Sequence, residues 1–108
     1  MTFNVLNIFS PKIRYASRSP KWSAVRKKHL LINNCCAACG SQKNLEVHHI
    51  IPVHLDSSLE LEPDNLITLC SKSCHLLFGH LMDYKSWNTN VIDDCKEISK
   101  RISNRPYK

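Results

Sequence analysis

The stretch CAACGSQKNLEVHHIIP, residues 36–52, holds the two features that decide how this chain folds. It opens with Cys36-x-x-Cys39 and a glycine, a spacing at which one tight turn places two sulfurs on a single ion. Cys70 follows 31 residues after Cys39, and Cys74 comes four residues later. Two close cysteine pairs favour a tetrahedral structural zinc that staples a core too small to hold alone.

Two other cysteines need separate interpretations. Cys35 adjoins Cys36 and could replace it as a ligand, although the C-x-x-C-G form favours Cys36. Cys95 falls on an apolar helix face and is expected to be a small core residue. Disulfides would suit a secreted chain, but the apolar N-terminus lacks the basic region and cleavage site of a signal peptide. We therefore expect a cytoplasmic protein.

The second half of the quoted stretch predicts a strand over residues 45–52. A polar connection, residues 53–64, leads to NLITLC, residues 65–70, which predicts a second strand and hence a hairpin with a long loop. Because successive strand side chains point to opposite faces, His48 and His49 should point away from each other.

Helices are expected on both sides of this hairpin. Ser19 and Pro20 suit the start of a basic helix over residues 19–31, after an irregular arm at 1–18. Residues 71–87 predict a further helix, weakened by Gly79, and residues 91–103 an amphipathic helix before a basic tail. The order predicts one α+β domain over residues 1–108, with a zinc-stapled core at 36–83.

Positive charge is concentrated at the two ends of the chain, whose net charge is +6. Residues 1–44 carry eight Lys or Arg and no acid, whereas residues 45–94 carry two basic and eight acidic residues. Basic segments of this kind suit a phosphate backbone, although a solvated helix face would have the same composition. The candidate DNA-binding residues are Arg14, Arg18, Lys21, Arg26, Lys27, Lys28, Lys100, Arg101 and Arg105.

The motifs CAACG, LEVHHIIP, DNLITLC and CH, in this order, resemble the HNH endonucleases of phages and bacteria. These are ββα-metal nucleases with a four-cysteine structural zinc site. The resemblance covers about residues 36–80, and the helix at 19–31 is also similar to one that often precedes the first cysteine pair. It implies metal-dependent hydrolysis of DNA phosphodiesters, by nicking or by double-strand cleavage.

The resemblance also implies roles for individual residues. His49 matches the general base, Asn65 the residue that holds this base across the loop, and His48 and His75 the ligands of a catalytic divalent ion. CSKSCH has one residue more than the usual pattern, which weakens the match at His75. His80 is a reserve ligand, because a residue five positions on lies about 140° around an α-helix.

Two imidazole ligands suit Mn²⁺, Ni²⁺, Co²⁺ or Zn²⁺ better than Mg²⁺. DNA is the implied partner, and a homodimer or a phage packaging or replication partner is compatible with the family. Two other readings of the sequence stay open. A non-catalytic zinc-stabilised nucleic-acid-binding module would keep the cysteines and the basic ends without needing His49. A zinc-stabilised protein-interaction domain would need only the cysteines.

Overall fold

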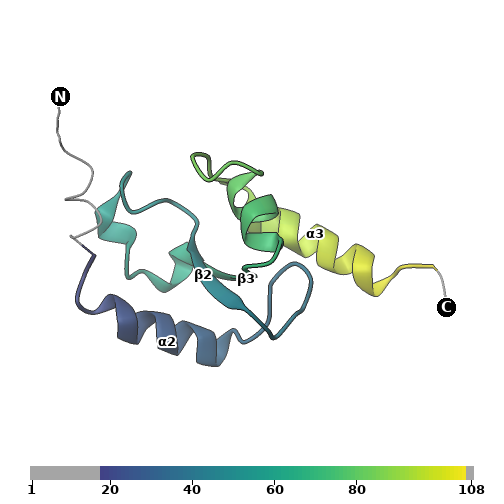
Figure 1. Ribbon diagram of the computed structural model, residues 1–108, viewed down its shortest axis with the longest axis horizontal. Coiled ribbons are helices and arrows are strands. Elements are labelled where there is room, and N and C mark those ends of the chain that lie inside the picture. The colour runs from purple at the N-terminus through teal and green to yellow at the C-terminus, as the bar shows by residue number, and fades with distance from the viewer. Residues whose placement is uncertain (1–17, 107–108) are drawn as a thin grey trace.

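The computed structural model describes residues 18–106, which form a small α+β domain around a two-stranded sheet (Figure 1). Residues 1–17 of the arm predicted at 1–18 lie outside the described residues, and the candidate Arg14 is among them. In chain order the elements are α2 (Trp22–Ile32), β2 (Leu45–His49), the 3₁₀ turns η1 (Ser57–Leu59) and η2 (Pro63–Asn65), β3 (Leu66–Cys70), the π-helical turn η3 (His75–Gly79) and α3 (Val91–Ser103).

The predicted hairpin is confirmed, because β2 pairs with β3 in antiparallel register from Leu45–Cys70 to His49–Leu66. All five residues of β3 are buried, so this strand runs through the core. The first strand is shorter than the predicted range of 45–52. It ends at His49 because the Ile51 N–H is taken by the side chain of Asn65, and Pro52 has no N–H to offer a ladder.

The core is small and rich in sulfur. Its buried residues are Cys36, Ala38, Ile50, Ile67, Leu69, Cys70, Cys74, Val91 and Cys95. Cys95 is the core thiol that the sequence predicted, and α3 matches the expected range of 91–103. A core with four cysteines among nine residues gains less from apolar burial than one of Leu and Ile.

The basic helix α2 begins and ends later than the expected range of 19–31. The carbonyl and hydroxyl of Ser19 accept the N–H groups of Trp22 and Lys21, so residues 19–21 form a turn ahead of the first helical residue. Figure 1 shows α2 beside the two strands, whereas α3 extends away at the C-terminal end. No residue of α2 is fully buried, so only half-buried side chains attach this helix to the rest of the domain.

The predicted helix over residues 71–87 is wrong in length and type. The chain makes a single π-helical turn at His75–Gly79 and then a loop. Leu81 and Met82 take left-handed backbone angles (φ 54° and 72°), which end any helix there. Among the described residues, no helix is long and apolar enough to cross a membrane.

Candidate metal centres and active site

The four predicted zinc ligands meet at one point. Cys36 and Cys39 come from the turn before β2, Cys70 ends β3, and Cys74 precedes η3. Their ligand atoms all lie within 4.8 Å of one another, and the sulfurs of Cys39 and Cys70 are 3.8 Å apart. Four sulfurs placed tetrahedrally about 2.3 Å from an ion would be about 3.8 Å apart, so the cluster fits zinc.

Gly40 allows the knuckle to close. Its left-handed backbone (φ 82°) returns its N–H to the Cys36 carbonyl at 3.0 Å, and the Cys39 N–H donates to the Cys36 sulfur at 3.5 Å. Around Cys70, burial opposes ionisation of the thiol, but hydrogen bonds from the backbone at Cys74 and Ser73 lower its pKa to about 6. A thiolate at neutral pH is the form that binds zinc.

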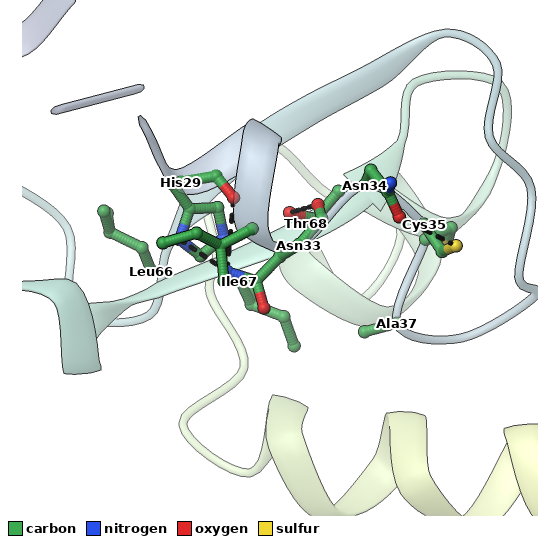
Figure 2. Close-up of a pocket in the computed structure, with 10 residues that line it drawn as sticks. His29, Asn33, Asn34, Cys35, Ala37, Leu66, Ile67 and Thr68 are labelled. Atoms are coloured by element: carbon green, nitrogen blue, oxygen red, sulfur yellow. Dashed lines mark hydrogen bonds between the residues drawn. The ribbon is translucent and has the colours of Figure 1, made fainter. Parts of the chain in front are cut away.

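Cys35 is not part of this cluster. Its thiol is exposed and donates to the Asn34 side chain at 3.4 Å, beside a cavity of about 370 Å³ between the end of α2 and β3 (Figure 2). His29 lines the same cavity, near the end of α2 as its position in the sequence predicts. The preference for Cys36 over Cys35 is therefore supported, and this cavity contains none of the histidines of the predicted active site.

Three histidines form a second cluster that could hold a metal: His48, His75 and His80. The Nδ1 atom of His48 lies 3.0 Å from Nε2 of His75, and Nε2 of His80 lies 3.2 Å from the same atom. Imidazole nitrogens bound tetrahedrally at about 2.0 to 2.1 Å from an ion would be about 3.3 Å apart. These distances fit a shared divalent cation.

The hydrogen bonds on the outer side of this cluster fix which nitrogens face inward. A backbone carbonyl can only accept, so Nδ1 of His80 donates to the Ser86 carbonyl at 2.7 Å, and Nε2 of the neutral ring carries a lone pair. Nδ1 of His75 lies 2.7 Å from a carboxylate oxygen of Glu46, which likewise leaves Nε2 free to bind a metal. Outer partners of this kind are typical of metal-binding histidines.

The π-helical turn explains why His80 joins the cluster. An α-helix over residues 75–80 would place His80 about 140° around the axis from His75. A π-helix bonds residue i to i+5, so residues five apart fall on the same side of the turn. Gly79 is buried in this turn, and a Cβ there would lie 3.1 Å from both the His48 and His75 rings. The glycine makes room for the imidazoles.

Within the cluster, the surroundings of His48 favour its neutral ring. Burial, together with smaller contributions from the neighbouring His75, His80 and His49, lowers the pKa of His48 to about 3. Nε2 of His48 is buried without a hydrogen-bond partner. A neutral imidazole is the form that binds a cation, so His48 is in the form that a metal site needs.

His49 points to the other face of β2, as strand alternation predicts. Its Nε2 lies 2.9 Å from the Glu60 backbone carbonyl and therefore carries the proton, which leaves Nδ1 as the acceptor. Burial lowers the pKa of His49, and the positive charge of Arg18 lowers it as well. Although the two rings diverge, His48 and His49 border the same cavity.

Asn65 ties the loop between the strands to the end of β2. Its side-chain oxygen accepts the Ile51 N–H at 2.8 Å, and its amide donates to the carbonyls of Ile51 and Leu59 at 3.0 and 3.2 Å. Leu59 directly precedes Glu60, whose carbonyl bonds His49. Asn65 therefore fixes the loop residue that orients this histidine.

The cavity that His48 and His49 border has a volume of about 1110 Å³. Its lining includes His48, His49, His75 and His80, together with Trp22, Glu46, His54 and Tyr84. Of the candidate DNA-binding residues, Arg18 and Arg26 line it, while Lys21, Lys27 and Lys28 are exposed on or beside α2. Lys100, Arg101 and Arg105 lie on or after α3, and Arg101 pairs with Glu97 at 3.0 Å.

Three residues at the site were missed from the sequence: Trp22, Glu46 and Glu60. Glu46 contacts His75 from the neighbouring strand, and Glu60 is buried with its carboxylate 3.6 Å from Arg18. Glu46 could have been found from the sequence, because it lies two residues before His48 and therefore on the same face of the strand. The contacts of Trp22 and Glu60 depend on tertiary packing, which no local pattern contains.

The comparisons with known proteins agree with this geometry. Residues 33–80 match the family described as HNH endonuclease, a range that runs from the end of α2 through both cysteine pairs and all four site histidines. Searches of curated proteins and of solved structures gave no significant match. The matched range, the four-cysteine cluster and the ββ hairpin followed by a helical turn identify residues 33–80 as a domain of the HNH endonuclease family, whose function is nuclease or nucleic-acid-related.

Proposed function

We propose that this protein is a metal-dependent DNA endonuclease that hydrolyses phosphodiester bonds, with His49 as the general base. The observation that carries the proposal is the convergence of three imidazole nitrogens beside His49 in one cavity flanked by arginines. His48 and His75 would hold a divalent ion, with His80 as a third ligand. When bound, that ion would supply positive charge to stabilise the phosphate oxygens in the transition state.

The chemistry assigned to His49 follows from its tautomer. Nε2 donates to Glu60, so the lone pair on Nδ1 is available to accept a proton from water. Because burial lowers its pKa, the ring is neutral at pH 7 and does not need to lose a proton first. Asn65 acts as a positioning residue, since its three hydrogen bonds hold the loop that carries the Glu60 carbonyl.

The duplex would approach along the face of α2 that borders the cavity. Trp22 and Arg26 lie four residues apart on α2 and therefore on the same side of it, Arg18 lies just before the helix, and all three line the cavity. Two guanidinium groups on this side suit neighbouring phosphates. Contacts of this kind position the backbone without reading sequence, so we expect weak sequence preference.

Plasmid nicking by the zinc-loaded protein tests the proposal. With Mn²⁺, Ni²⁺ or Co²⁺, wild type should convert supercoiled plasmid to the open-circular or linear form. Chelation of the added metal should stop the reaction. His49→Ala should lose about 100-fold or more in rate while it still binds DNA. Unchanged nicking by this variant would overturn the role of His49, and wild type that binds DNA but never nicks it would indicate a binding module.

A further inference from the structure

The helix α2 contributes an aromatic ring to the site from outside the segment that matches the family. Trp22, the first residue of α2, precedes the matched range of 33–80 by eleven residues. Its ring packs on His49, with ring centroids 4.6 Å apart and planes tilted by 33°. Among the described residues, the aromatic ring that packs on Trp22 is therefore that of the proposed general base.

A second set of contacts holds Trp22 where it is. The Arg18 guanidinium lies over the Trp22 ring, 5.2 Å from its centroid, and its Nε is 3.6 Å from a carboxylate oxygen of Glu60. The same carboxylate accepts the Ser19 N–H at 3.0 Å. Glu60 thus binds the start of α2 through its side chain and His49 through its backbone carbonyl.

The Glu60 carbonyl and the Trp22 ring restrain different motions of the His49 ring. The hydrogen bond from Nε2 fixes the direction of one ring atom but allows the imidazole to swing about that point. The indole ring of Trp22, packed against the imidazole, prevents this rotation and keeps water away from that side of His49. Because no side chain of α2 is fully buried, Trp22 is not explained as a member of the apolar core.

We propose that Trp22 is a positioning residue that holds the imidazole of His49 in its reactive orientation, with Arg18 and Glu60 holding Trp22 in turn. This inference rests on the proposed function, because it assigns Trp22 to the same reaction. The phosphodiester hydrolysis would then need α2 as well as the matched domain. Small misplacements of a reacting group cost about 100-fold in rate, so the effect should fall on kcat.

The test compares Trp22→Ala with Trp22→Phe in the full chain, loaded with zinc and Mn²⁺. Trp22→Ala should lower kcat for nicking about 10- to 100-fold with KM for DNA little changed, and Trp22→Phe should recover most of the rate. The control is Trp87→Ala, because Trp87 also packs on a histidine, His54, at 5.9 Å but lies outside the proposed machinery. It should keep kcat within about two-fold.

Two kinetic outcomes would overturn the inference. One is Trp22→Ala with wild-type kcat, and the other is Trp22→Phe with as large a loss as Trp22→Ala. NMR of the His49 ring gives a readout independent of activity. The Trp22 ring current should shift the His49 ring protons in wild type, and Trp22→Ala should remove that shift and broaden the signals. Wild type without nuclease activity would refute the proposed function alone, whereas His49 signals unchanged by Trp22→Ala would refute the positioning role.

Discussion

Gly79 shows how one missing side chain shapes the metal cluster. In Gly79→Ala the new methyl would lie 3.1 Å from the His48 and His75 rings, closer than ordinary contact. The rings must move apart, and their nitrogens would no longer share one cation. We expect affinity for Mn²⁺ or Ni²⁺ to fall by about 10-fold or more, as for other losses of ligand orientation. Calorimetric titration of the zinc-loaded protein measures it.

The other glycine of the described chain is a suitable control. A methyl at Gly40 meets open space, but the left-handed backbone there (φ 82°) strains any other residue. Gly40→Ala should therefore lower the melting temperature by destabilising the cysteine knuckle, while the folded protein keeps its histidine-site affinity. Equal metal affinity in wild type and Gly79→Ala would show that the rings do not need this space.

His48 makes stability depend on pH. Its pKa is about 3 in the folded protein and near 6.5 in an unfolded chain, so the unfolded state binds more protons between these values. Stability is therefore lost as pH falls below about 6.5. At pH 5 the loss is on the order of 2 kcal/mol for protein without metal at the histidine site.

Denaturant melts of zinc-loaded protein at pH 7 and pH 5 measure this loss. His48→Gln cannot titrate but keeps the remaining histidines and the zinc site, so its stability should change less between the two pH values. If the variant shows the same pH dependence as wild type, then His48 is not the group responsible.

At the scale of elements, the hairpin, α3 and the cysteine pairs could be predicted because each depends on local patterns. Alternating residues around Leu45–His49 and the buried run Leu66–Cys70 specify strands, and C-x-x-C specifies a turn. The turn at His75–Gly79 could not be predicted. In its π-helical geometry the histidine rings lie against Gly79, a tertiary contact that no local pattern contains, and α-helical spacing placed His80 wrongly. The contact between Trp22 and His49 likewise joins elements 27 residues apart.

The arginines of α2 and α3 should differ in their contribution to DNA binding. Arg26 on α2 lines the cavity of the proposed active site, whereas Arg101 on α3 pairs with Glu97 and does not line it. Arg26→Ala should weaken binding of duplex DNA and reduce its salt slope by about one unit, the loss of one phosphate contact. Arg101→Ala, the matched control, should change both less. Fluorescence anisotropy at several salt concentrations measures both, and equal effects would place the duplex across both helices.

In the whole molecule the two metal sites share one segment. Cys70 ends β3, Cys74 follows, and His75 is the very next residue, so the cysteine cluster fixes the position of the first residue of η3, a proposed ligand of the catalytic ion. The cysteines are also a large part of the buried core. Loss of the zinc should therefore disturb the histidine cluster and the fold together, whereas loss of the catalytic ion should leave the fold intact.

Two adjacent cysteines allow a direct test of whether the fold depends on the zinc. Cys36 is buried and belongs to the zinc cluster, whereas Cys35 is exposed and does not. Cys36→Ser should abolish the cooperative thermal transition and bind less than one equivalent of zinc, because the binding free energy of a structural zinc is folding free energy. Cys35→Ser, one residue away, should melt as wild type does and bind zinc fully. Calorimetry and metal analysis distinguish them, and the reverse result would place Cys35 on the zinc and move the knuckle by one residue.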